Sequence, residues 1–168
     1  MLKGDYPFTN QESEMKKIIF VLTFCIASIG SAYAFDQKLS EHYLEMTSKM
    51  DQAALAKSTG NISAAKVLEM MAKKEDFVFL DVRTPAEQAV VGISYKNTLN
   101  IPMNELFKAE NLAKLPTNKP IIVVCHGWSR SVGATAMLKS VGFNNAIFLK
   151  GGLVDLVTAT TPSTAPEK

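Results

Sequence analysis

The sequence predicts an α/β fold in which a parallel sheet is covered by helices on both faces. Between residues 61 and 158, short apolar runs of strand length alternate with segments of helical periodicity. This alternation is typical of parallel strands joined by helical crossovers. The runs are continuously apolar, as expected for strands that are buried on both faces. Ligands of such folds bind at the carboxyl ends of the strands.

The first half of this region predicts two helices and two strands. Ser63 has the position of an N-cap for a helix that runs to about residue 74. Residues 77–80 predict a short buried strand, and Thr84-Pro85 is typical of the cap and first residue of a second helix. After an irregular segment, residues 99–102 predict a short strand or an extended link.

The second half predicts the central strand and the elements around it. Asn104 is expected to cap a helix that runs to about residue 115. The remaining elements are a central strand at 121–124, a helix at 131–141, a strand at 146–149 and a short last helix after Gly151-Gly152.

Residues 1–34 predict a cleavable signal peptide. Met15 opens a short basic start, residues 18–29 are apolar, and Ala32-Tyr33-Ala34 fits a signal peptidase site. The apolar stretch is shorter than the roughly 20 residues of a membrane-spanning helix. We therefore expect translation from Met15, cleavage after Ala34, no stable membrane insertion and a periplasmic or secreted protein. The alternatives are a buried N-terminal helix and lipidation at Cys25, which the preceding Phe24 disfavours.

The expected mature chain has three parts. Residues 35–60 are polar and helix-prone, with a loose apolar stripe and His42 as a surface or packing residue. Residues 61–158 form the α/β domain. Residues 159–168 are rich in Thr, Pro, Ser and Ala, which predicts a disordered tail.

Composition excludes several function classes. The net charge is only +2 and no basic cluster occurs, so nucleic acid binding is not expected. The sequence has no Walker loop, no dinucleotide fingerprint and no C-x-x-C pair. His42, His126 and one cysteine do not have the spacing of a zinc site. We expect neither a metal nor a cofactor.

The segment from Cys125 to Ser131 predicts a reactive thiol. It lies between the central strand and the following helix, where a helix N-terminus contributes about half a positive charge. Such a field lowers a cysteine pKa from about 8.5, and Arg130 adds a fixed cation for an anionic substrate. After signal cleavage Cys125 is the remaining cysteine of the chain. The alternative is an inert, buried cysteine.

Three segments resemble the rhodanese-like domains. They are the D-V-R-x-x-x-E segment at 80–87, the N-I-P segment at 99–102, and the stretch from Lys119 through Cys125 to the Gly151-Gly152 turn. The resemblance covers roughly residues 61–158. It implies a three-layer domain with about five short, mostly parallel strands. It also implies a thiosulfate sulfurtransferase-like enzyme that moves sulfane sulfur from an anionic donor to cyanide, a small thiol or a protein acceptor.

The resemblance also implies roles for individual residues. Cys125 is expected to be the nucleophile that carries the sulfur as a persulfide, and Asp81 and Arg83 to support the site. Glu87 could pair with Arg83. Donor and persulfide are expected to be bound by Arg130 and the loop residues His126, Gly127, Trp128, Ser129 and Ser131. Related phosphatases have five residues between the cysteine and the arginine, whereas this chain has the four of sulfurtransferases.

Two positions leave alternatives open. Trp128 stands where many family members have glycine, and its ring could narrow the pocket, offer an acceptor an apolar surface, or simply pack over the loop. A protonated His126 could favour the thiolate of Cys125. Ser129 is not expected to be a nucleophile, because Ser131 stands where the G-x-S-x-G motif needs glycine.

Besides the sulfurtransferase, we consider two other functions. One is a non-catalytic binding or sulfur-carrier module that docks through residues 35–60, and the other is a cysteine phosphatase.

Overall fold

The structure is a computed structural model that describes residues 35–49, 51–52 and 60–166. It divides into two compact units, one ending at Ser48 and one beginning at Lys49, and each is described by itself. The predicted signal peptide, residues 1–34, lies outside the described residues. In the part of the chain that is described, no helix is both long and apolar enough to cross a bilayer.

The first unit contains helix α2 (Gln37–Ser48). The Asp36 carboxylate accepts a hydrogen bond from the backbone N–H of Leu39 at 3.0 Å, which satisfies one of the free donors at the helix start. Leu39, Tyr43 and Leu44 are exposed on this helix.

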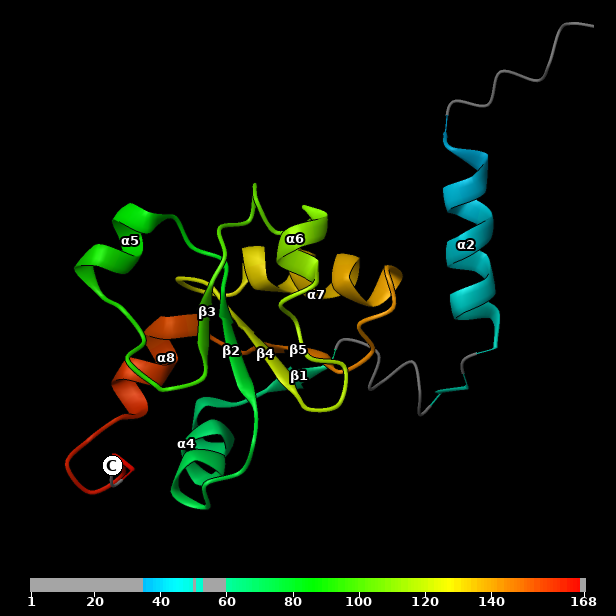
Figure 1. The fold of residues 1–168 in the computed structure, drawn as a ribbon. Helices are drawn as coiled ribbons and strands as arrows, with labels where there is room; N and C mark the ends of the chain where they lie inside the picture. The colour runs from blue at the N-terminus through cyan, green and yellow to red at the C-terminus, as the bar shows by residue number, and fades with distance from the viewer. Residues whose placement is uncertain (1–34, 50, 53–59, 167–168) are drawn as a thin grey trace, which may run out of the picture. The chain divides into compact units, whose positions relative to one another are not determined.

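The second unit is built on a five-stranded sheet in which every strand pair is parallel (Figure 1). The strand order is β1-β5-β4-β2-β3, so β4 lies at the centre. The bounds are β1 (Asn61–Ile62), β2 (Val78–Asp81), β3 (Thr98–Asn100), β4 (Ile121–Val124) and β5 (Ala146–Leu149). Every residue of β2 and β4 is buried, in agreement with the continuously apolar runs. The expected parallel sheet is confirmed.

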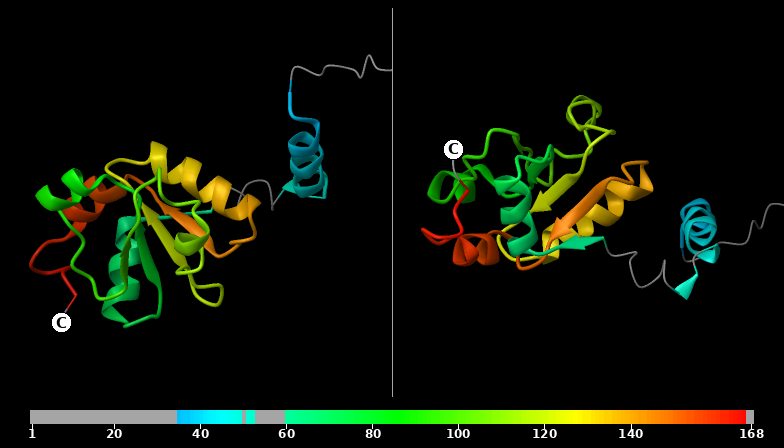
Figure 2. Two further views of the ribbon diagram at one scale, coloured as in Figure 1. Left: turned by 45° about the horizontal axis from the view of Figure 1, so that its top comes forward. Right: turned by 90° about the horizontal axis from the view of Figure 1, so that it is seen from below.

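Helices cover both faces of the sheet, as Figures 1 and 2 show. One face packs against α4 (Ala64–Ala72) and α8 (Gly152–Ala159) through a core that includes Val67, Phe79 and Leu156. The other face packs against α7 (Ser129–Ser140) and the segment around α6 (Ala109–Leu112), with Leu80, Val123 and Leu138 in its core. Apolar residues therefore alternate between two cores along β2 and β4, as the period of a strand requires.

Both predicted helix starts between residues 63 and 85 are confirmed by their capping hydrogen bonds. The Ser63 hydroxyl accepts from the backbone N–H of Lys66 at 3.2 Å, at the start of α4. Helix α5 (Pro85–Val90) begins with a complete capping box, in which the hydroxyl of Thr84 and the carboxylate of Glu87 each accept a bond from the other's backbone N–H.

One expectation about local structure was wrong, and one strand was not predicted. A helix from Asn104 to about residue 115 is absent, and this segment forms turns followed by α6, which covers only Ala109–Leu112. The side chain of Asn111 is buried and donates to the Glu105 carbonyl oxygen at 2.8 Å, which satisfies a turn rather than a continuous helix. Strand β1 was not predicted, because two residues are too few to show a period.

Candidate active site

Cys125 directly follows β4, the central strand, and is almost completely buried, with 1% of its surface exposed. Its Sγ donates to the Ser131 hydroxyl at 3.5 Å, and that hydroxyl donates to the Trp128 carbonyl oxygen at 2.8 Å. The thiol is therefore held inside the segment 125–131, which we call the cysteine loop.

The backbone of the cysteine loop presents unpaired donors. Helix α7 begins at Ser129, and its N-cap residue Trp128 makes no side-chain capping bond. Among the described residues, the N–H groups of residues 126–131 find no hydrogen-bond acceptor. Free N–H groups and the positive end of a helix together favour a bound anion.

The start of α8 fixes the cysteine loop from the other side. The N–H of Leu153 donates to the Cys125 carbonyl oxygen at 2.9 Å. The N–H of Val154 donates to the His126 carbonyl oxygen at 3.2 Å. Gly152 has φ +62°, and a Cβ at this position would lie 1.7 Å from the Gly127 carbonyl oxygen. Only glycine allows so close an approach of the two backbones.

Arg130 is paired with Glu87, a partner that the sequence did not predict. Its Nη1 and Nη2 donate to the two carboxylate oxygens at 2.8 and 2.6 Å. The hydrogen bonds from Arg130, followed by that from the Thr84 N–H, hold the pKa of Glu87 well below its usual range. The same bonds raise the pKa of Arg130, with smaller contributions from Cys125 and Asp81. The guanidinium thus lies within electrostatic range of the thiol.

Arg83 pairs with Asp81, not with Glu87, so the expected pairing with Glu87 was wrong. The Arg83 guanidinium contacts both carboxylate oxygens, with Nη2 to Oδ2 at 2.6 Å, and it also donates to the Val91 carbonyl oxygen at 2.7 Å. Both side chains are at most 2% exposed. Asp81 lies opposite Val124 in the sheet register, so this buried pair joins the end of β2 to the segment after α5 beside the cysteine loop.

The outer surface of the site is apolar. Trp128 is 63% exposed, so most of its side chain faces solvent. A hollow of about 470 Å³ lies beside His126, and Val90 at its edge is 84% exposed. Its other lining residues are Arg83, Glu87, Val91, Leu153, Val154, Val157 and Thr158. The sequence did not reveal these valines, because they follow no motif and meet only in the fold.

For the other residues of the cysteine loop the structure gives positions, and their roles in binding stay predictions. Gly127 and Ser129 lie at the surface of the loop, Ser131 is buried against the thiol, and His126 is exposed. Within the described ranges, no group of three or more His, Cys, Asp or Glu side chains could hold a metal ion.

The chain matches a known domain family and several of its members. The family model "Rhodanese-like domain" matches residues 63–159. A sulfurtransferase from Allochromatium vinosum is 28% identical over 106 residues, which are 63% of this chain and 95% of that protein. The probable adenylyltransferase/sulfurtransferase MoeZ from Mycobacterium tuberculosis is 32% identical over 104 residues, 62% of this chain. The match spans about a quarter of MoeZ, 26% of its length.

The solved structures agree on the fold. A rhodanese-related protein from Thermoplasma volcanium has a TM-score of 0.52 at 29% identity, and the match covers 61% of this chain and 95% of that one. The relatives named as sulfurtransferases support sulfur transfer at the level of the family. The family model, the parallel sheet with helices on both faces, and the cysteine loop after the central strand show that this chain belongs to the rhodanese-like domain family.

Proposed function

We propose that this protein is a sulfurtransferase that carries sulfane sulfur as a persulfide on Cys125. The observation that supports it best is the cysteine loop itself. A thiol at the end of the central strand is followed by backbone N–H groups that find no acceptor in the described part of the chain, and by the guanidinium of Arg130. These groups suit an anionic sulfur donor such as thiosulfate.

The first step is a displacement at sulfur. The Cys125 thiolate attacks the outer sulfur of thiosulfate, and a bond forms between Sγ and that sulfur. The bond between the two sulfur atoms of thiosulfate breaks, and sulfite leaves with the electron pair. The Cys125 persulfide that remains carries one negative charge. Free N–H groups of the cysteine loop stabilise this anion.

In the second step an acceptor takes the outer sulfur. Cyanide or a thiolate attacks it, the persulfide bond breaks, and the Cys125 thiolate is restored with thiocyanate or a new persulfide as product. Trp128 in the cysteine loop is exposed, and the apolar hollow borders His126 of the same loop. This surface favours an acceptor with apolar parts, a small thiol or a protein thiol, over a bare ion.

Arg130 binds the anionic sulfur donor while it remains paired with Glu87. The guanidinium has five N–H donors, and its hydrogen bonds to Glu87 use one donor from each terminal nitrogen. The ion pair fixes the side chain, so that its remaining donors keep a constant direction. Glu87 is therefore a positioning residue in this proposal.

We also propose that the protein is exported to the periplasm or the medium, because residues 1–34 have the pattern of a signal peptide. The mature chain then has no second cysteine to resolve the persulfide. The sulfur must pass to an external acceptor. Export is tested by fractionating cells that express the full chain and by finding the N-terminus of the product, which should be Phe35.

Intact-mass spectrometry tests the sulfur chemistry. Treatment with thiosulfate is expected to add one sulfur atom to the protein, cyanide to remove it, and the Cys125→Ser variant to gain none. Absence of the added sulfur with several donors, despite a reactive thiol, would refute the proposal. A stable complex without turnover that requires residues 35–60 would favour a binding module. Hydrolysis of an aryl phosphate that depends on Cys125 would favour a phosphatase.

A further inference from the structure

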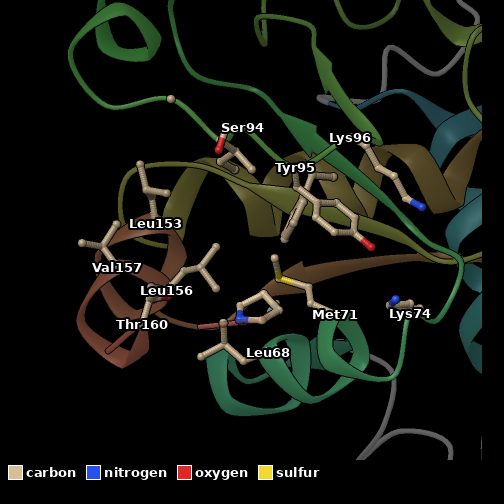
Figure 3. A pocket seen from close by; sticks show the side chains of 14 residues that line it. Leu68, Met71, Lys74, Ser94, Tyr95, Lys96, Leu153, Leu156, Val157 and Thr160 are labelled. Carbon is tan, nitrogen blue, oxygen red and sulfur yellow. The ribbon is translucent and has the colours of Figure 1, made fainter. Parts of the chain in front are cut away.

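A second and larger cavity adjoins the hollow beside His126, with which it shares the lining residues Leu153 and Val157. Its volume is about 760 Å³, within the range of small-molecule sites. Figure 3 shows Leu68 and Met71 of α4 on one side and Ser94 and Tyr95 on the other. The full lining is Leu68, Met71, Lys74, Phe79, Gly92, Ile93, Ser94, Tyr95, Lys96, Leu153, Leu156, Val157, Thr160 and Pro166. No residue from 125 to 131 contributes to it.

Aromatic packing holds the wall of this cavity in place. The Tyr95 ring stacks on Phe77 with centroids 5.1 Å apart, and it meets Phe79 edge-on at 5.8 Å. Phe77 and Phe79 are completely buried, so Tyr95 is anchored to the core while its side chain borders the cavity. A preformed apolar wall lowers the entropy cost of binding a flexible ligand.

One end of the cavity is basic. Figure 3 shows Leu153, Leu156 and Val157 at one end, and the ammonium groups of Lys74 and Lys96 with the Tyr95 hydroxyl toward the other. Among the described residues, neither ammonium has an acidic partner, and no acidic side chain lines the cavity. The lining thus combines a long apolar surface with two positive charges at one end, neither of which has an acidic partner within the described ranges.

We propose that this cavity binds a single-chain amphiphile with an anionic head, such as a medium-chain carboxylate. The alkyl chain lies between α4, α8 and the segment 92–96, and the carboxylate lies at Lys74 and Lys96. This inference goes beyond the proposed sulfur transfer, because it concerns a different ligand in a cavity that no residue of the cysteine loop lines.

Calorimetric titration with saturated carboxylates below their micelle concentrations tests the apolar part. Each methylene that enters the cavity is expected to tighten binding about fourfold, so affinity rises about 15-fold from octanoate to decanoate. Ser94→Trp, which places a large ring at the exposed edge of the cavity, is expected to weaken decanoate binding at least tenfold. An affinity that does not depend on chain length would overturn the proposal.

The head group is tested with a charge variant and a matched control. K74Q/K96Q is expected to weaken dodecanoate binding about fivefold or more and to leave dodecanol binding unchanged. K108Q/K114Q, which removes the same charge around α6, should bind dodecanoate as the wild type does. Equal binding of dodecyltrimethylammonium, or an unchanged affinity of K74Q/K96Q for dodecanoate, would refute the anionic head. Because the readout is binding, the result is independent of sulfur transfer at Cys125.

Discussion

Replacing Gly152 by alanine is expected to displace the cysteine loop. The residue has φ +62°, a conformation that costs a residue with a Cβ about 1 kcal/mol. The added Cβ would lie 1.7 Å from the Gly127 carbonyl oxygen and 2.7 Å from that of Cys125. The backbones of α8 and of the loop must therefore move apart by more than an ångström, as judged from ordinary contact distances of about 3.5 Å.

This separation breaks specific hydrogen bonds. Two hydrogen bonds join the same two segments. The N–H of Leu153 donates to the Cys125 carbonyl oxygen at 2.9 Å, and the N–H of Val154 donates to the His126 carbonyl oxygen at 3.2 Å. Each contributes about 1 kcal/mol net. With the backbone strain, the free energy of unfolding should fall by about 3 kcal/mol, a large part of the roughly 5–15 kcal/mol of a typical domain. Sulfur loading of Cys125 should slow by about 100-fold, because a shift of 1 Å at a site has this effect.

Urea denaturation and the rate of persulfide formation are the two measurements. Gly127→Ala is the matched control for stability, since a Cβ there would meet no atom within 4 Å, and its free energy of unfolding should change by less than about 1 kcal/mol. The reasoning is refuted if Gly152→Ala unfolds within about 1 kcal/mol of the wild type and gains sulfur at the wild-type rate.

Three further predictions concern single side chains. Asp81→Asn leaves the Arg83 charge buried without its partner, so the free energy of unfolding, measured in urea, should fall by about 3–5 kcal/mol. The control is Asp76→Asn, which breaks the exposed pair with Lys119 and should lower the free energy of unfolding by less than about 1 kcal/mol. Glu87→Gln can keep the capping box but loses the charge paired with Arg130. Because the pKa of Glu87 is lowered by folding, the ion pair stabilises above the ordinary value of about 4.3 and is lost as the pH falls toward the folded value. The wild type should therefore be about 1 kcal/mol more stable than Glu87→Gln at pH 7, and this difference in the free energy of unfolding should shrink below about pH 4. A difference that does not depend on pH would show that the ion pair with Arg130 does not stabilise the fold. Trp128→Ala removes a side chain that is 63% exposed, so the melting temperature should barely change. KM for a bulky thiol acceptor should rise several-fold, whereas KM for cyanide should stay constant. Equal effects on both acceptors would exclude a contact between Trp128 and the acceptor.

Much of the fold could be predicted because its signals are local. Strands β2, β4 and β5 are apolar runs that need burial on both faces, and their predicted positions agree with the structure within one residue. The caps at Ser63 and Thr84 involve residues three positions apart, a spacing that the sequence shows directly. The position of Cys125 after β4 follows from the same strand prediction.

The partners of charged residues could not be predicted in this way. Glu87 lies four residues from Arg83 and 43 from Arg130, and the sequence favoured the nearer arginine. In the fold, Asp81 is completely buried and takes the Arg83 guanidinium, since a buried carboxylate needs a partner more than an exposed one does. Glu87, at the start of α5, then meets Arg130 at the start of α7.

The sequence by itself determined the parallel sheet, most helix starts and the place of the thiol, because each depends on the burial period or hydrogen bonds of neighbouring residues. Only the tertiary structure decided which residues meet across the fold: Arg130 with Glu87, Gly152 against Gly127, and α4, α8 and Tyr95 around the apolar cavity. These contacts join segments far apart in the chain, and their geometry depends on how the helices pack on the two faces of the sheet.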